Sequence, residues 1–262
     1  MSRGKMLIGI SCTVAAVVAV LIGLMLAGYF GGVGPFAQLK KKVDGKLPGN
    51  GPEYDLSYVV PLSSSPLAGK NICFLGSSVT CGAASGGVSF VEYLSKRNCF
   101  TYVKEAVGGT TLVDSGKDSY VSRLKNIDKS NCFDLFICQL STNDASKKTP
   151  LGTPSDVTPD TVCGAVNYII SYVEETWRCP VVFYSNPRYD SEEYQKMVDN
   201  LRLIAADKQI ILIDLYNNDD FNDITQEERK HYMADNVHPT RAGYLKWWTP
   251  EMEKVLYEMC IL

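Results

Sequence analysis

From Asn71 to the C-terminus, short apolar runs alternate with longer amphipathic stretches. The apolar runs cover residues 71–75, 101–107, 133–140, 181–184 and 210–215, and the amphipathic stretches cover 88–96, 118–127, 158–177, 191–206 and about 241–259. Strands that alternate with helices in this way predict a parallel sheet covered by helices on both faces. We therefore expect an α/β domain over residues 68–262, with three α/β/α layers and a central parallel sheet.

The N-terminus differs from this domain, because no charged residue occurs between Met6 and Phe30. A helix over that run, rising about 1.5 Å per residue, is long enough to cross a hydrocarbon core of about 30 Å. A cleaved signal peptide is the alternative, since Arg3 and Lys5 precede the run and small residues lie near its end. The run exceeds the usual apolar region of a signal peptide, about 7–15 residues. We expect residues 1–30 to form an uncleaved transmembrane signal-anchor.

Residues 31–67 are rich in Gly, Pro, Ser and Lys, with a breaker cluster, Leu-Pro-Gly-Asn-Gly-Pro, at 47–52. We expect this segment to be a flexible tether between membrane and domain. Lysines at 40–42 and 46 follow the apolar run, so basic residues flank both of its ends. A basic segment before the first apolar stretch is typical of export signals. We therefore expect a single-pass membrane protein with an extracytoplasmic domain.

Composition narrows the class of protein further. The 262 residues are 45% hydrophobic and carry a net charge of -3, so they can form one sizeable core and show no basic stripe for nucleic acid. There are nine cysteines but no Cys-x-x-Cys pair, and Cys73 and Cys138 fall inside apolar strand patterns. We expect buried free thiols rather than a disulfide framework, and neither a metal nor another cofactor. The oligomeric state stays open.

Four short polar motifs lie where predicted strands end or where the last helix is about to begin. They are Gly-Ser-Ser-Val-Thr at 76–80, Gly-Gly-Thr-Thr at 108–111, Ser-Thr-Asn-Asp at 141–144 and Asp-Asn-Val-His-Pro at 235–239. Each alone is ordinary turn chemistry. In an open parallel sheet, however, ligands bind outside the carboxyl ends of the strands. The placement of the motifs therefore predicts one common site.

The residue types in these motifs suit nucleophilic catalysis. Ser78 follows a strand directly, so its hydroxyl can be exposed as a nucleophile, although a helix cap is the alternative. The chain has two histidines, and His238 has Asp235 three positions before it and Pro239 directly after it. That carboxylate can orient the imidazole and stabilise its charged form. We expect His238 to be the general base and His231 to be inert.

Acyl transfer also needs hydrogen-bond donors that face the oxyanion of the tetrahedral intermediate. Asn143 offers a side-chain amide, and the backbone N–H groups of Ser78 and Gly109 are its natural companions. Gly108 is the alternative to Gly109, while spacing to Thr110 favours Gly109. Simple turn roles are the alternative for both Asn143 and Gly109.

Together the four motifs resemble the SGNH (GDSL-type) hydrolase family, named for one Ser, Gly, Asn and His in separate blocks. The resemblance implies a flavodoxin-like fold, a Ser78–His238–Asp235 triad and an oxyanion hole at Gly109 and Asn143, without a cofactor. Two blocks differ from the family pattern. Gly-Ser-Ser at 76–78 replaces Gly-Asp-Ser, and Ser-Thr-Asn-Asp at 141–144 replaces Gly-x-Asn-Asp.

The resemblance implies ester hydrolysis through an acyl-enzyme, as in lipases, thioesterases and polysaccharide deacetylases. Because we expect the domain to face outward, we favour a carbohydrate or small acyl ester deacetylase whose substrate is a small-molecule or glycan ester. An acyltransferase on the same fold and a catalytically silent module that binds glycans or a partner are the alternatives. Of two adjacent tryptophans in the last helix, Trp247 and Trp248, we expect only one to face the core.

Overall fold

The computed structural model describes residues 18, 20–25, 42–114, 116 and 118–261. The chain divides into two compact units, Met1–Lys46 and Leu47–Leu262. In the first unit residues 20–25 are helical, and most of the expected span at 6–30 lies outside the described residues. Among the helices of the described part, none has the length and apolar character needed to cross a membrane.

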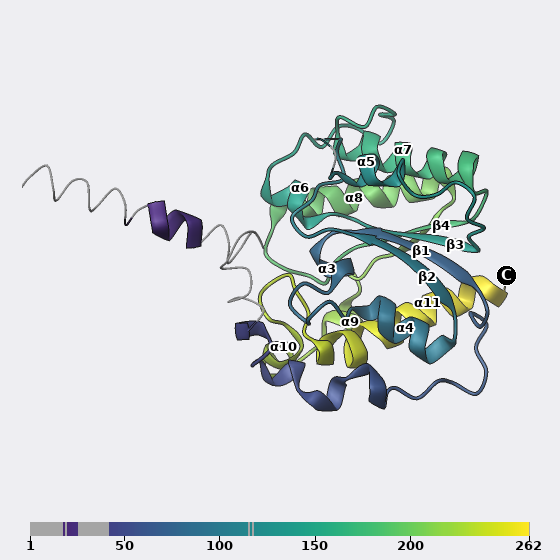
Figure 1. Cartoon of the computed structure of the whole chain (residues 1–262). Coiled ribbons are helices and arrows are strands. Elements are labelled where there is room, and N and C mark those ends of the chain that lie inside the picture. The colour runs from purple at the N-terminus through teal and green to yellow at the C-terminus, as the bar shows by residue number, and fades with distance from the viewer. Residues whose placement is uncertain (1–17, 19, 26–41, 115, 117, 262) are drawn as a thin grey trace, which may run out of the picture. The chain divides into compact units, whose positions relative to one another are not determined.

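The second unit is built on a five-stranded sheet whose strands are all parallel. Its order is β2-β1-β3-β4-β5 (Figure 1), with β1 at Asn71–Gly76, β2 at Thr101–Ala106, β3 at Leu135–Gln139, β4 at Val181–Tyr184 and β5 at Ile211–Ile213. Gly76 pairs with Ala106, and Gln139 pairs with Tyr184, so the carboxyl ends of these strands lie at one edge. The predicted parallel sheet is confirmed.

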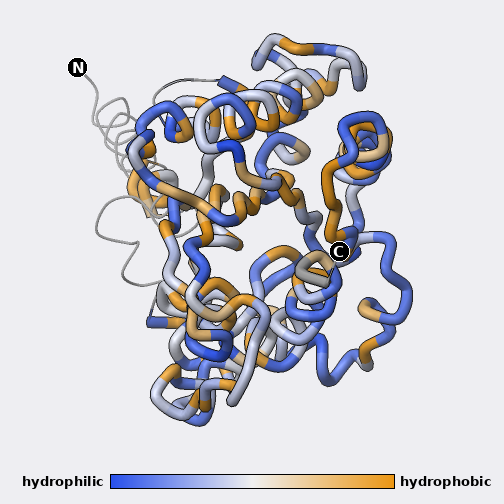
Figure 2. Tube along the Cα trace, turned by 90° about the vertical axis from the view of Figure 1, so that its right-hand side faces the viewer, coloured by the Kyte–Doolittle hydropathy of each residue, from blue (hydrophilic) through white to orange (hydrophobic). Residues whose placement is uncertain are grey.

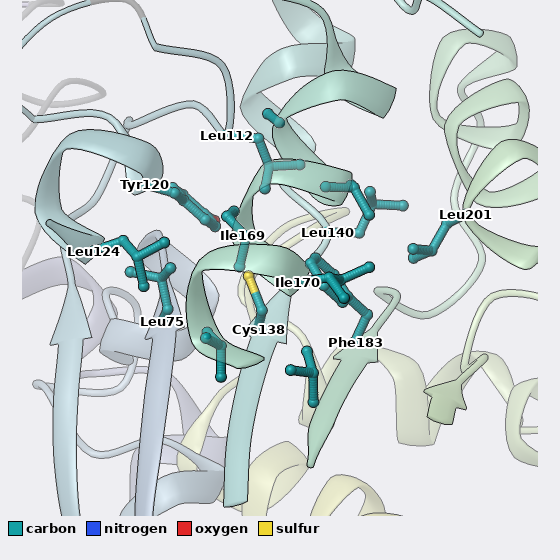
Figure 3. Close-up of a cluster of buried hydrophobic side chains, with 14 of the residues drawn as sticks. Leu75, Leu112, Tyr120, Leu124, Cys138, Leu140, Ile169, Ile170, Phe183 and Leu201 are labelled. Carbon is teal, nitrogen blue, oxygen red and sulfur yellow. The ribbon is translucent and has the colours of Figure 1, made fainter. Parts of the chain in front are cut away.

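Helices cover both faces of this sheet (Figure 1). One layer contains α5 (Tyr120–Leu124), α7 (Val162–Thr176) and α8 (Glu192–Lys208), and the other contains α4 (Phe90–Asn98), α9 (Asp219–Asn222) and α11 (Thr249–Ile261). Each layer buries its own hydrophobic cluster against the sheet. Figure 3 shows part of the first cluster, with Ile169 and Ile170 of α7 close to Cys138 of β3. In Figure 2 hydrophobic stretches of chain run between the helical layers.

Local sequence signals start these helices. Ser89 and Glu92 form a capping box at α4, and the hydroxyls of Thr161 and Ser191 accept backbone N–H groups at the starts of α7 and α8. Cys73 and Cys138 are buried in β1 and β3, as their strand patterns predict. Burial raises the pKa of both thiols well above the usual value.

The helix expected at 241–259 consists of a π-helical segment, η4 (Gly243–Trp248), that continues into α11. Both Trp247 and Trp248 are buried in the core, so the expectation that only one of them faces it was wrong. Trp247 stacks on Phe221 of α9, with ring centroids 4.5 Å apart, and its Nε1 donates to the Phe221 carbonyl at 2.7 Å. Trp248 stacks on Phe90 of α4, with ring centroids 5.6 Å apart. Both tryptophans belong to the same hydrophobic cluster, in which α9 and α4 supply their neighbours.

Residues 47–67, expected to belong to the tether, instead pack on the α/β unit. They form three short 3-10 helices, η1 (Pro48–Asn50), η2 (Pro52–Tyr54) and η3 (Leu56–Tyr58), followed by a segment in which Leu67 is buried. Prolines at the first positions of η1 and η2 fit this geometry, since the missing N–H is not needed there. The same Pro and Gly residues that predict a break in a long element therefore also suit a folded, irregular segment.

Candidate active site

Ser78 begins a short helix, α3 (Ser78–Cys81), immediately after β1 and the intervening Ser77. The turn is tight, because a Cβ on Gly76 would lie 1.7 Å from the Thr80 hydroxyl. Ser78 itself is largely buried, at 7% exposure. The sequence thus places a serine hydroxyl at the junction of a central strand and a helix N-terminus.

His238 lies on a hairpin between α10 (Gln226–Tyr232) and η4. Met233 pairs with Pro239 in an antiparallel bridge, and the Ala234 N–H donates to the His238 carbonyl at 2.8 Å. At the base of the hairpin the Thr240 N–H donates to the Tyr232 carbonyl, also at 2.8 Å. These bonds close the hairpin and fix the backbone at His238.

Ser78, His238 and Asp235 form a continuous chain of hydrogen bonds. The distance from His238 Nε2 to Ser78 Oγ is 2.7 Å, and His238 Nδ1 lies 2.8 Å from Asp235 Oδ2 and 2.9 Å from Oδ1. The backbone N–H groups of Val237 and His238 also donate to Asp235 Oδ1, at 2.9 and 2.8 Å. Burial favours a higher pKa for Asp235, but the hydrogen bond and charge of His238, with these N–H groups, lower the pKa to about 2. The carboxylate therefore stays ionised at neutral pH.

Asn143 lies in α6 (Thr142–Ser146), directly after β3. The Ser141 hydroxyl accepts the Asn143 N–H at 3.2 Å, and Asn143 Nδ2 donates to the Thr110 carbonyl at 2.9 Å. Lys147 donates to the Gly109 carbonyl at 2.9 Å. The loop with both glycines is thus attached to the segment that carries Asn143.

The two glycines differ in their surroundings. Gly109 has φ +79°, which an L side chain rarely adopts, and open space where a Cβ would stand. Gly108 lies beside the serine, since a Cβ built on it would be 3.7 Å from Ser78 Cβ. Within the described chain, no residue accepts the backbone N–H of Ser78 or Gly109. Both N–H groups and the second Asn143 amide proton are therefore available to an oxyanion; the preference for Gly109 over Gly108 stays a prediction.

Several buried polar residues that support the site were missed in the sequence. Gln139, at the end of β3, accepts the Ser77 N–H and the Thr80 hydroxyl at Oε1, both at 2.9 Å. Its Nε2 donates to Asn186 Oδ1 at 3.3 Å, and Asn186 Nδ2 donates to the Val237 carbonyl at 3.3 Å. Two carboxamides thus connect the turn before Ser78 with the residue before His238. A glutamine inside an otherwise apolar strand pattern was the available signal.

Arg123 of α5 is another missed residue, with 5% exposure. Its guanidinium donates to the Glu105 carbonyl at 2.7 Å, the Gly76 carbonyl at 2.8 Å and the Thr110 hydroxyl at 3.1 Å. It therefore holds together the ends of β1 and β2 and the glycine loop. Nothing in an amphipathic helix pattern separates such an arginine from a solvent-exposed one.

Asp144 is a further buried residue that binds the segment after the glycine loop. It is fully buried, and its Oδ2 accepts the Leu112 N–H at 2.7 Å. Burial raises its pKa, although hydrogen bonds from the Leu112 backbone and the Ser141 side chain act in the opposite direction.

The second histidine, His231, is not part of this chain of contacts, and its Nε2 lies 2.9 Å from the Tyr54 hydroxyl. No group of three metal-binding side chains occurs among the described residues.

Two shallow hollows border the site. One, of about 430 Å³, is lined mainly by the glycine loop, Asp118, Ser119 and Lys147. The other, of about 380 Å³, lies beside Asp235 and includes Arg229 and Lys230. A further hollow of about 570 Å³, lined among others by Arg188, Tyr189 and Tyr216, includes none of the predicted site residues.

The sequence profile of the GDSL-like Lipase/Acylhydrolase family matches residues 74–246. The chain belongs to this family. The resemblance that the four motifs indicate is thereby confirmed, and all five predicted site residues lie within the matched range. This GDSL-like protein is accordingly an esterase of the acylhydrolase class.

Solved structures that resemble this GDSL-like protein share its fold. A Lactobacillus plantarum protein is 18% identical, with a TM-score of 0.60 over 72% of this chain and 97% of its own. The acetyl xylan esterase AlAXEase is 17% identical, with a TM-score of 0.54 over 71% and 99%. A lipolytic G-D-S-L family protein from Veillonella parvula is 19% identical, with a TM-score of 0.52 over 72% and 98%. No curated protein matches the chain.

Proposed function

We propose that this protein is a serine esterase in which Ser78 is the nucleophile and His238 is the general base. Asp235 orients the imidazole of His238 and stabilises its positive charge. The observation that carries the proposal is the unbroken hydrogen-bonded chain from Ser78 Oγ through the imidazole to the ionised carboxylate. These three groups come from separate parts of the sequence. A merely structural serine and histidine do not require such a chain.

The reaction follows from the geometry. His238 takes the Ser78 hydroxyl proton as Oγ attacks the acyl carbonyl, and the positive imidazole is stabilised by Asp235. The N–H groups of Ser78 and Gly109 and the amide of Asn143 stabilise the oxyanion. His238 then gives its proton to the leaving alcohol. Water repeats the sequence on the acyl-enzyme and releases the acid and free Ser78.

The substrate we propose is a short acyl ester, acetyl above all, of a carbohydrate or another polar alcohol. The hollow at the glycine loop supports this choice, because most of its lining is backbone, hydroxyl or charged groups. A long acyl chain needs an apolar groove. The likeness to an acetyl xylan esterase agrees with this choice, at the level of fold alone.

We assign the N-terminal segment the role of a membrane anchor, with the esterase domain outside the cytoplasm. The uncharged run from Met6 to Phe30 supports the anchor, and Arg3 and Lys5 support this orientation. Retention of the full chain in the membrane pellet after alkaline carbonate washing tests the anchor. Release of the whole chain would contradict it.

Hydrolysis is favoured over acyl transfer by the openness of the site. The side chains of His238 and Asp235 are 24% and 45% exposed, so water can reach the base. An acyltransferase must instead keep water away from the acyl-enzyme. A silent binding module is disfavoured by the same Ser78–His238 contact, since binding alone does not need an activated hydroxyl.

The test uses the full chain in detergent micelles, treated with a fluorophosphonate probe and assayed on p-nitrophenyl acetate and octanoate. We expect labelling at Ser78 and faster turnover of acetate. Ser78→Ala should lose both, whereas Ser130→Ala, which removes an exposed hydroxyl bonded to Asp128, should keep both. Folded protein without labelling or turnover would favour the binding module, and faster turnover of octanoate would contradict the short-acyl substrate.

A further inference from the structure

Residues 47–58, here named the N-terminal strap, lie before the part of the chain that the family profile matches. The strap comprises η1, η2 and η3 and belongs to the same compact unit as the sheet. It contains none of the residues of the proposed chemistry. Its hydrogen bonds nevertheless reach both the loop that follows α3, the helix of Ser78, and the hairpin that carries His238.

Asn50 makes a direct bridge between these loops. Its Nδ2 donates to the carbonyl of Ala84, in the loop that follows α3, at 2.7 Å. Its Oδ1 accepts the N–H of Arg241, three residues after His238, at 2.8 Å. One carboxamide thus uses a donor and an acceptor to fasten the loop after α3 to the end of the histidine hairpin.

Gly49 and Tyr54 hold the strap against the base of the same hairpin. A Cβ on Gly49 would lie 2.0 Å from the His231 carbonyl oxygen and 2.4 Å from the Thr240 hydroxyl, so no side chain fits there without displacement. The Tyr54 hydroxyl lies 2.9 Å from His231 Nε2, with the two rings edge to face. The strap therefore contacts the base of the hairpin, at His231 and Thr240.

Arg241 adds a second connection from the hairpin side. Its Nε donates to the Ser85 carbonyl at 3.1 Å, and its Nη1 lies 3.3 Å from Asp55 Oδ2 of the strap. The strap, the loop after α3 and the end of the hairpin thus form one connected cluster. Ser78 lies in α3, just before this loop, and His238 lies in the hairpin. Their 2.7 Å contact therefore depends on how these two segments are held.

We propose that the N-terminal strap, through Asn50, positions His238 relative to Ser78, and that Asn50 is a positioning residue for ester cleavage. This inference rests on the proposed serine-esterase function. Misplacement of catalytic groups by about 1 Å can lower rates about 100-fold. Loss of the bonds from Asn50 to Ala84 and Arg241 should therefore lower kcat, with little change in KM, because these bonds hold the protein backbone rather than the substrate.

The experiment compares full-length variants in detergent micelles, measuring kcat and KM on p-nitrophenyl acetate and the rate of fluorophosphonate labelling at Ser78. Asn50→Ala should lower kcat and the labelling rate at least tenfold at a temperature well below its Tm. Asn50→Asp, which keeps an acceptor for Arg241, should recover part of the loss. Gly49→Ala should resemble Asn50→Ala, since it displaces the strap while leaving Asn50 intact.

The matched control is Asn200→Ala, which removes an exposed side chain whose Nδ2 donates to Lys196 of the same helix. It should leave kcat, KM and labelling unchanged. Full kcat and labelling in both Asn50→Ala and Gly49→Ala would overturn the strap proposal while leaving the esterase intact. The strap proposal would also be overturned if Asn50→Ala and Gly49→Ala lost activity only in proportion to the fraction of unfolded protein, while Asn50→Asp and Tyr54→Phe kept full activity. A wild-type chain without turnover or labelling would overturn the esterase proposal and this one together.

Discussion

At the scale of single residues, the role of Asp235 is the sharpest test of the proposed triad. Asp235→Asn keeps the size of the side chain but removes the charge that stabilises protonated His238, and its amide can favour the wrong imidazole tautomer. We expect kcat on p-nitrophenyl acetate to fall by about 10⁴-fold. Asp190→Asn, a change of the same kind in a residue outside the site, should retain normal kcat.

The lowered pKa of Asp235 has its own consequence for stability. Its folded value of about 2 lies below the ordinary 3.8, so the ionised carboxylate stabilises the fold above pH 3.8, and this contribution is lost as the pH falls through about 2. Urea unfolding of wild type and Asp235→Asn should therefore show a difference that shrinks between these pH values. A constant difference from pH 6 to pH 2 would contradict the ionised, hydrogen-bonded carboxylate.

At the scale of elements, Gln139 is expected to matter because it joins β3 to the turn that begins α3. Gln139→Leu leaves the buried Ser77 N–H without its acceptor, which costs about 1–3 kcal/mol. It also breaks the carboxamide connection toward Val237. We expect a lower free energy of unfolding in urea and a lower kcat. Gln195→Leu, on the exposed face of α8, removes only a bond to Asp199 and should change neither; an unaltered Gln139→Leu would show that the connection is dispensable.

The elements also show what the sequence could and could not reveal. The strands and long helices were predictable, because apolar periodicity and caps such as Ser89 with Glu92 are local signals. The proximity of the three motifs that follow β1, β2 and β3 could be predicted from the rule that the carboxyl ends of parallel strands lie at one edge of a sheet. The burial of Trp247 was not predictable, since its cover, Phe221, comes from another helix. Arg123 was missed for the same reason: its partners are backbone carbonyls distant in sequence.

At the scale of the whole molecule, the site depends on segments from Asn50 to Arg241 held in one compact unit. The residues of the proposed site and their supporting contacts thus come from most of the sequence of the α/β unit. Residues 1–46 belong to the other compact unit. The boundary at Leu47 differs from the expected domain start at 68. The strap lies between residue 47 and residue 68. Chains truncated at these two positions should therefore behave differently.

A chain that starts at Leu47 keeps the strap, the sheet and all proposed site residues. We expect it to cleave p-nitrophenyl acetate with a kcat within about twofold of the full chain, since its buried contacts are those of one compact unit. If residues 1–30 are the anchor, it should also leave the membrane pellet. A chain that starts at residue 68 loses Asn50 and the buried Val59 and Leu67, and should be both less stable and slower. Equal activity of the two truncated chains would show that residues 47–67 are only a tether after all.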